Sequence, residues 1–343
     1  MRVDVQADDE VHETEMSLAL IVVVALIEAD LSLHAIQYAR HQPHVLTMVV
    51  VPGSAKRRNA MNPTSSKDMQ IRFRTVDGVT VRYAESDGHR DRLILLTNPW
   101  PESLYAFLPI WQSLSEHSRL IAIDLPGFGQ SERRDDLLSP QAMGEFLIQL
   151  LDEWELDTPH LVSPDIGTVA SLFAAARHPG KLRSLVVGNG GTAYPLQVAG
   201  TLKDIIEAPD LEAFRAIDPR VTLGASLDTG HEHYRLPAEV REDYLQSYEG
   251  DRFAESTRYV RRYPKALPVL GALLPEIQTP VQIISSLRDP LVPPVNGEYL
   301  YARLPNSKLD LLDAAHYPWE DAADQYAAII SAWVKDGYQN TGA

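Results

Sequence analysis

The chain has 343 residues and a formal net charge of −16, from 31 Lys and Arg against 47 Asp and Glu. Such an acidic protein repels phosphate backbones, so nucleic acid is not expected as a partner. Cysteine is absent, which excludes disulfides, thiolate catalysis and metal sites built on cysteine. The length suits either one large domain or two small ones, with a core large enough to enclose a cleft.

The first 68 residues differ in character from the rest, and we predict an N-terminal extension and linker that is poorly ordered. An unbroken apolar run at 18–27 is shorter than the ~20 residues that a membrane-spanning helix needs. Acidic residues precede this run, whereas a signal peptide carries positive charge there. The run is then a hydrophobic helix on a surface groove or an extension outside the fold. We therefore expect no stable membrane span and a cytoplasmic protein.

Short apolar strands alternate with helices from residue 70 onward. The alternation begins with a hairpin, because Asp77-Gly78 between two apolar runs is a strong turn signal. In chain order we predict strands at 71–76, 79–84, 93–97, 120–123, 161–162, 185–187, 281–285 and 309–312. We predict helices at 140–154, 167–177, 294–303 and 320–335. This order predicts an α/β fold with a mostly parallel sheet that is flanked by helices.

Residues 191–275 interrupt the alternation and are rich in proline, tyrosine and charge. We interpret them as a mainly helical lid, inserted between the sixth and seventh core strands. It would cover the carboxyl edge of the sheet, where ligands bind in open α/β folds. The predicted organisation is thus an extension at 1–68, a core formed by 69–190 and 276–343, and the lid at 191–275.

The most informative segment places Asp165 between a predicted strand and a predicted helix. Ser163 and Gly167, two positions before and two after it, are small, as a nucleophile on a sharp strand-to-helix turn requires. The amides at the start of the helix would keep the carboxylate ionised. The alternative is a structural role for Asp165 as the N-cap of this helix, which Asp favours.

This turn resembles the nucleophile elbow of the α/β-hydrolase superfamily, with Asp165 where Gly-x-Ser-x-Gly has serine. An aspartate there marks the branch of epoxide hydrolases and haloalkane dehalogenases. Segment 124–131 matches a further family signature, which supports the fold and assigns no chemistry to Asp124. The resemblance covers residues 70–336 and implies the α/β-hydrolase fold.

The loop at 95–103 resembles the family's His-Gly-x-Pro loop, which contributes a backbone amide to the oxyanion hole. By this resemblance Trp100 and Ile166 supply the two donors, and fixed amides stabilise an oxyanion without reorganising. Asn98 and Pro99 replace the family's His and Gly. Because proline lacks an N–H and restricts the residue before it, the loop could be shaped differently.

Two further residues follow the last two predicted strands, at the positions where the family carries its acid and its base. Asp289 matches the acid, although Asp-Pro is also a common turn pair. His316 matches the catalytic histidine. The chain order of nucleophile, acid and histidine, 165, 289 and 316, is the order expected of this fold.

A carboxylate nucleophile favours particular chemistry. It can displace a leaving group from an sp³ carbon and form an alkyl ester, which His316 would hydrolyse by activating water. With an ester as substrate it would form an anhydride, which is less favourable. The sequence therefore predicts epoxide hydrolysis to a vicinal diol first, and dehalogenation of an alkyl halide second.

The leaving group separates these two reactions. An epoxide oxygen needs an acid, and the resemblance implies lid tyrosines that donate a hydrogen bond. Tyr259 matches best, with Tyr263 as its neighbour and Tyr234 as a weaker candidate for substrate binding; all three could instead pack the lid. A halide needs N–H donors. Ile166 stands where haloalkane dehalogenases usually carry Trp, and Trp100 could supply one indole N–H.

The predicted mechanism requires no metal and no organic cofactor. The expected partners are a small hydrophobic epoxide or alkyl halide and water, and both a monomer and a homodimer are compatible with the sequence. His231 and His233 alternate in a polar part of the lid, so we predict surface residues and not a metal pair. Since Asn98 and Pro99 alter the oxyanion loop, a divergent non-hydrolytic or ligand-binding member of the fold is the alternative.

Overall fold

The computed structural model describes residues 69–87 and 91–341. The predicted extension at 1–68 lies outside the described residues, so its interpretation stays a prediction. In the described part of the chain, no helix is long and apolar enough to cross a membrane.

An eight-stranded sheet forms the centre of the described fold, in the order β1-β2-β4-β3-β5-β6-β7-β8. β1 pairs with β2 and β2 with β4 antiparallel, and all other pairs are parallel. The strands are β1 (Ile71–Val76), β2 (Val79–Glu85), β3 (Leu93–Thr97), β4 (Arg119–Ile123), β5 (His160–Val162), β6 (Ser184–Val187), β7 (Val281–Ser286) and β8 (Ser307–Leu312). Each predicted strand is confirmed, and the mostly parallel α/β sheet with it.

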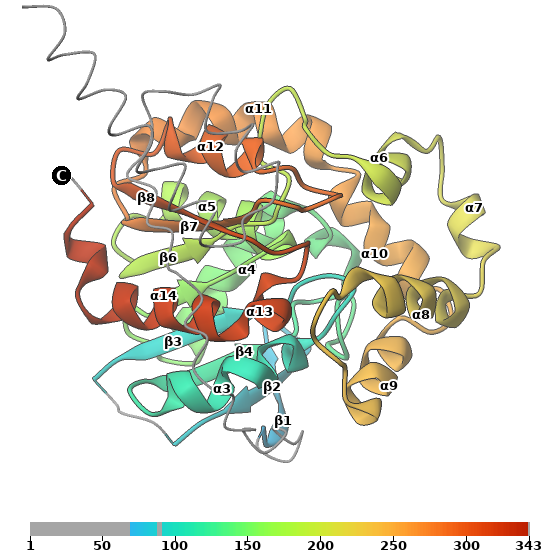
Figure 1. Ribbon diagram of the computed structural model, residues 1–343, viewed down its shortest axis with the longest axis horizontal. Helices are drawn as coiled ribbons and strands as arrows, with labels where there is room; N and C mark the ends of the chain where they lie inside the picture. Colours follow the sequence, from blue (N-terminus) through green and yellow to red (C-terminus); the bar gives the residue numbers. More distant parts are fainter. Residues whose placement is uncertain (1–68, 88–90, 342–343) are drawn as a thin grey trace, which may run out of the picture. The chain divides into compact units, whose positions relative to one another are not determined.

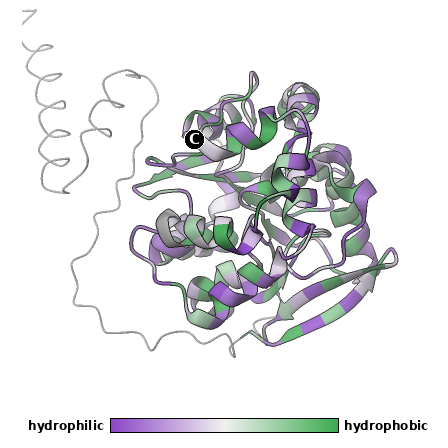
Figure 2. Cartoon of the chain, turned by 90° about the vertical axis from the view of Figure 1, so that its right-hand side faces the viewer, coloured by the Kyte–Doolittle hydropathy of each residue, from purple (hydrophilic) through white to green (hydrophobic). Residues whose placement is uncertain are grey.

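The hairpin and the inner strands differ in the way the sequence predicts. Asp77 and Gly78 both take positive φ, at 48° and 76°, which is the backbone of a tight two-residue hairpin turn. Figure 2 shows hydrophilic and hydrophobic residues alternating along this hairpin, whose first strand is largely exposed. By contrast, β5, β6 and β7 are buried at every residue, as parallel strands covered on both faces must be.

Helices cover both faces of the sheet (Figure 1). α3 (Leu108–Ser115) packs with α14 (Ala323–Lys335) on one face, and α4 (Pro140–Glu153) packs with α5 (Ile166–Arg177) on the other. α12 (Val295–Tyr301) packs against β7 and β8, and the short α13 (Pro318–Asp321) precedes α14. The four predicted helices are therefore confirmed, the last of them as the pair α13 and α14, while α3 was not predicted.

The lid consists of helices, as predicted, and lies between β6 and β7. Its members are α6 (Gly200–Glu207), α7 (Glu212–Arg215), α8 (Pro219–Gly230), α9 (Ala238–Ser247), α10 (Arg252–Val260) and α11 (Tyr263–Leu273), followed by η4 (Leu274–Glu276). Most of them gather at the right of Figure 1, whereas α11 packs on α4 and α5 of the core.

A buried ion-pair group joins the lid to the core. Arg82 of β2 contacts Asp124 at 3.2 Å and Asp243 of α9 at 2.6 Å. Ser103 donates a hydrogen bond to Asp243 at 2.6 Å, and the Leu104 amide donates to Asp124 at 2.7 Å. These contacts agree with the prediction that Asp124 is a structural residue.

Candidate active site

Asp165, Asp289 and His316 meet at one edge of the sheet because each follows a parallel strand. They come after β5, β7 and β8, whose carboxyl ends lie on the same side. All three side chains are buried, and Asp165 is 6% exposed. The sequence order thus becomes a spatial cluster at the edge where α/β folds bind ligands.

The turn at Asp165 has the tight geometry that its small flanking residues predict. Asp165 takes φ 51° and ψ −121°, a conformation that costs free energy in a residue with a side chain. A Cβ at Gly167 would lie 2.3 Å from Ser163 Oγ and 2.4 Å from Thr97 Oγ1. A side chain at position 167 would therefore push strand and helix apart, and glycine lets them approach closely at the turn that carries Asp165.

The Asp165 carboxylate faces the two predicted oxyanion donors. The Trp100 amide donates to Asp165 Oδ2 at 2.6 Å. Burial raises the pKa of Asp165 to about 6, against the opposing effects of His316 and of hydrogen bonds from the Trp100 and Ile166 amides. The carboxylate is thus held in a buried site by amides that could stabilise an oxyanion.

The predicted acid and base are in contact. His316 Nδ1 lies 2.7 Å from Asp289 Oδ2, and His316 Nε2 lies 4.0 Å from Asp165 Oδ1. Burial by itself lowers the pKa of His316, but the charge and hydrogen bond of Asp289, together with Asp165, raise it above its usual value. The 4.0 Å gap is too long for a direct hydrogen bond and suits a base that acts through a water molecule.

Asn189 belongs to this group and was missed in the sequence. Its Nδ2 donates to Asp289 Oδ2 at 2.9 Å and to the His316 carbonyl at 3.2 Å, so it holds both partners of the pair. Asn189 comes shortly after β6 with φ 50°. The sequence did contain a signal for Asn189, because it is a polar residue that follows a buried parallel strand. Such residues lie at the carboxyl edge of the sheet, as Asp165 does.

The loop at 95–103 directs the Trp100 amide at Asp165 although Asn98 and Pro99 replace the family's His and Gly. Asn98 Oδ1 accepts a hydrogen bond from the Leu125 amide at 2.8 Å, and Asn98 Nδ2 donates to the Pro99 carbonyl at 2.8 Å. This side chain ties the loop to the strand edge and to itself. The replacement of the family's His and Gly therefore leaves the Trp100 amide directed at Asp165.

The lid reaches the site through α10. The Trp100 indole N–H donates to Ser256 Oγ at 2.9 Å, and the indole stacks on Phe253 with ring centroids 5.9 Å apart. The indole N–H that could have served a halide is therefore engaged by the lid.

Tyr259 and Tyr263 both lie near the nucleophile turn. Tyr259 donates its hydroxyl to the Ile166 carbonyl at 2.9 Å, and its ring lies 6.1 Å from that of Tyr263. Burial raises the pKa of both phenols, and the Asp165 charge raises it further, so both stay protonated donors. Tyr259 can serve a substrate only after its hydroxyl leaves the Ile166 carbonyl.

Tyr234 has different neighbours. Burial raises the pKa of its phenol, followed by the charges of Glu320 and Glu102. Its backbone amide donates to Asp321 at 2.8 Å, which ties this part of the lid to α13. The structure therefore places Tyr234 beside a second buried group and not with the Tyr259 pair.

The prediction for His231 was wrong. His231 is 7% exposed, with Nε2 in contact with Glu320 Oε2, while His233 is exposed as predicted. The polar composition of this segment suggested a surface, but α13 covers the His231 ring from a distant part of the chain. Glu102, His231 and Glu320 bring their ligand atoms within 4.8 Å of one another.

With fold and site in view, comparison with known proteins defines the class. Residues 92–323 match the model of the alpha/beta hydrolase fold family, and the chain belongs to this family. A curated relative is "Uncharacterized hydrolase YugF" from Bacillus subtilis (strain 168). It is 26% identical over 276 residues, which cover 77% of this chain and 98% of YugF.

Solved structures agree on the fold. Epoxide hydrolase VrEH1 from Vigna radiata superposes with a TM-score of 0.64 at 17% identity, covering 79% of this chain and 99% of its own. The enol-lactonase from Burkholderia xenovorans LB400 gives 0.64 at 17%, covering 77% and 100%. The names of the two proteins describe different reactions, so these similarities show the fold and do not indicate a substrate.

Proposed function

We propose that the protein hydrolyses epoxides to vicinal diols through a covalent ester on Asp165. The observation that carries the proposal is a buried carboxylate at the nucleophile turn, with Oδ2 bound by the Trp100 amide and Oδ1 4.0 Å from His316 Nε2. This arrangement suits attack by Oδ1, because Oδ2 already lies where the oxyanion of the second step would form.

In the first step Asp165 Oδ1 forms a bond to one epoxide carbon, and the bond from that carbon to the epoxide oxygen breaks. The oxygen takes a proton from a lid phenol, for which Tyr259 is the first candidate and Tyr263 the second. Both are buried beside the Asp165 charge, and their raised pKa values keep them protonated until a stronger base forms. A substrate alkoxide is such a base.

In the second step water attacks Cγ of the Asp165 ester and gives its proton to His316 Nε2. Asp289 orients the imidazole through Nδ1 and stabilises the imidazolium that forms. The negative charge collects on Oδ2, at the Trp100 and Ile166 amides. Collapse breaks the ester bond and leaves Asp165 as a carboxylic acid, while the diol leaves with the proton from His316. Asp165 then releases its proton to solvent and the phenolate takes one up, so both groups return to their starting states.

The alternatives are weaker on specific grounds. Dehalogenation requires N–H donors for the halide, and the Trp100 indole N–H is bonded to Ser256. Ester hydrolysis would require a carboxylate to form an anhydride. Pure ligand binding would not require the Asp289–His316 pair at 2.7 Å beside a nucleophile turn.

The assay presents the full chain with terminal and internal epoxides, haloalkanes and simple esters, and measures diol, halide and acid. We expect diol from at least one epoxide, abolished in Asp165→Asn and unchanged in Asp204→Asn, an exposed carboxylate of the lid. Halide without diol would assign the dehalogenase reaction. Acid from esters that persists in Asp165→Asn would refute the proposed nucleophile.

A further inference from the structure

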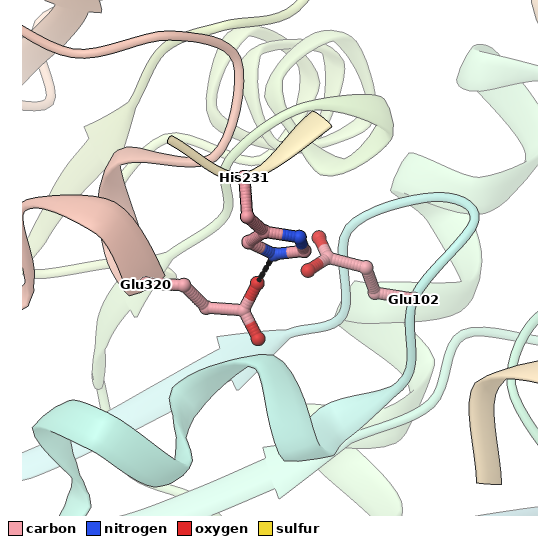
Figure 3. A group of neighbouring side chains, drawn as sticks. All are labelled: Glu102, His231 and Glu320. Atoms are coloured by element: carbon pink, nitrogen blue, oxygen red, sulfur yellow. Dashed lines mark hydrogen bonds and ion pairs between the residues drawn. The ribbon is translucent and has the colours of Figure 1, made fainter. Parts of the chain in front are cut away.

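A second buried group of ionisable side chains lies at the junction of lid and core. Glu102 comes from the loop after β3, His231 follows α8 of the lid, and Glu320 belongs to α13. Figure 3 shows both carboxylates turned toward the imidazole from opposite sides. All three residues are buried, and their ligand atoms lie within 4.8 Å of one another.

The tautomer of His231 is fixed by its environment. Nδ1 lies 3.0 Å from the Leu227 carbonyl oxygen, which can only accept, so Nδ1 carries a hydrogen. A neutral imidazole then presents the lone pair of Nε2 to Glu320 Oε2, the contact marked in Figure 3. A lone pair facing a carboxylate is repulsive unless a positive charge, either a proton or a metal ion, is shared between them.

Both carboxylates are held by donors from outside the group. Trp319 Nε1 donates to Glu102 Oε2 at 3.1 Å, and the Tyr244 hydroxyl donates to Glu320 Oε1 at 3.1 Å. Together with the Nδ1–H bond of His231, each of the three side chains thus has one orienting partner. Metal ligands in proteins are oriented in this way, with histidine donating its second N–H to a carbonyl.

The charge of the group also calls for a cation. Within the described residues, the ion pairs give Glu320 only His231 as a partner and give Glu102 none. With both carboxylates ionised and the imidazole neutral the group carries two negative charges, which bound protons or one divalent ion can balance. Zn²⁺ binds imidazole and carboxylate at about 2.0–2.2 Å in tetrahedral geometry, so two of its ligand atoms stand about 3.4 Å apart. An ion would therefore require His231 Nε2 and Glu320 Oε2, which are in contact, to move apart, and the ligand atoms already lie within 4.8 Å of one another.

We propose that Glu102, His231 and Glu320 bind one divalent transition-metal ion of the Zn²⁺ or Mn²⁺ type. The mixed nitrogen and oxygen ligands favour such ions over Mg²⁺ or Ca²⁺, which prefer oxygen alone. The ion links the lid, through His231, to the core, and Glu102 lies two positions after Trp100 in the oxyanion loop. The site is structural and takes no part in the chemistry at Asp165.

The first test uses the full chain, stripped with chelator and titrated by calorimetry with ZnCl₂, MnCl₂ or MgCl₂. We expect one tight Zn²⁺ or Mn²⁺ ion per chain and at least tenfold weaker Mg²⁺. His231→Gln and the isosteric Glu102→Gln should each weaken binding at least 100-fold. The exposed neighbour His233→Gln should bind as the parent does.

No saturable binding to the parent would overturn the proposal and leave a proton as the shared charge. Equal affinity in parent, His231→Gln and Glu102→Gln would overturn it too, because the ions would then occupy surface carboxylates. A crystal soaked in ZnCl₂ needs no variant. An anomalous peak between the three side chains supports the site, and peaks only elsewhere refute it. The trapping of Asp165 described below, run in chelator, keeps this result separate from the proposed function.

Discussion

At the scale of single residues, Asp165 combines burial, a positive φ of 51° and a charge held by the Trp100 amide. Burial of the charge and the positive φ each cost folding free energy, and the hydrogen bond from the Trp100 amide offsets part of that cost. A helix cap would need none of the three. The sequence predicted a cluster of Asp165, Asp289 and His316 because each stands in a short motif directly after a predicted strand, and the three side chains do lie together. It could not identify Asn189 as their partner, since its role depends on contacts about a hundred positions away.

Asp165→Asn should raise the free energy of unfolding at pH 7.5 by about 1–3 kcal/mol while abolishing activity. Burial raises the pKa of Asp165 from 3.8 to about 6, and two units correspond to about 3 kcal/mol against the charged form. A raised carboxyl pKa lowers the free energy of unfolding progressively as pH increases from 3.8 to about 6, and the full loss remains at higher pH. Urea unfolding at pH 7.5 and pH 4 should therefore show the gain at the higher pH, and an equal gain at both would contradict this account.

Tyr259→Phe should slow alkylation of Asp165 by an epoxide at least tenfold and slow reaction with a haloalkane much less. The epoxide oxygen needs a proton as its bond breaks, whereas a halide leaves without one. Stopped-flow or quenched-flow alkylation rates measure both. Tyr301→Phe, at a 41% exposed position, is the control. Equal rates in Tyr259→Phe and the parent would remove this phenol from the mechanism and transfer the role to Tyr263.

At the scale of elements, the strands and core helices were predictable because apolar runs and turn residues mark them directly. The helix α3 was not, although Leu108, Ile110, Trp111 and Leu114 are buried on it. It has only eight residues, with Pro109 at its second position, and it follows a 3-10 helix at Leu104–Phe107. Such a short helix shows too few turns for its apolar period to be recognised. Composition was enough to predict that the lid is helical. It was not enough to predict that α10 is a lid helix that contacts the site.

Gly167→Ala should destabilise the protein by about 1–3 kcal/mol and reduce activity at least tenfold. The added Cβ would lie 2.3 Å from Ser163 Oγ, so β5 and α5 must separate at the turn that positions Asp165. Gly224→Ala in lid helix α8 is a matched control, because its nearest neighbour is the flexible end of Arg241 at 3.0 Å. Equal losses in the two variants, read from urea unfolding and turnover, would refute the tight-turn explanation.

At the scale of the whole molecule, lid and core are joined by side chains that sequence reasoning could not pair. His231 meets Glu320 across 89 positions, and Arg82 meets Asp243 across 161. Composition suggested that the segment of His231 faces solvent, since a polar segment usually does. Burial of these charges is a consequence of the tertiary arrangement, in which each finds a partner on the core.

Asp243→Ala should destabilise the protein by about 3 kcal/mol and increase proteolytic cleavage within residues 191–275. It leaves Arg82 with Asp124 alone and removes the partner of Ser103, and breaking a buried pair on one side is costly. Asp251→Asn is the control, because its contact with Arg133 is exposed and its loss should change stability by about 0.5 kcal/mol or less. Unchanged lid cleavage in Asp243→Ala would show that this group does not secure the lid.

The central claim is that Asp165 forms a covalent ester, and His316→Gln tests it most directly. The variant keeps the nucleophile and its amides but lacks the base for the second step, so the ester should accumulate. Intact and peptide mass spectrometry after incubation with the epoxide panel should show one added substrate mass, located at Asp165. His117→Gln, an exposed position, should turn over without accumulating an adduct. No adduct at Asp165 across the epoxide and haloalkane panels would contradict the account.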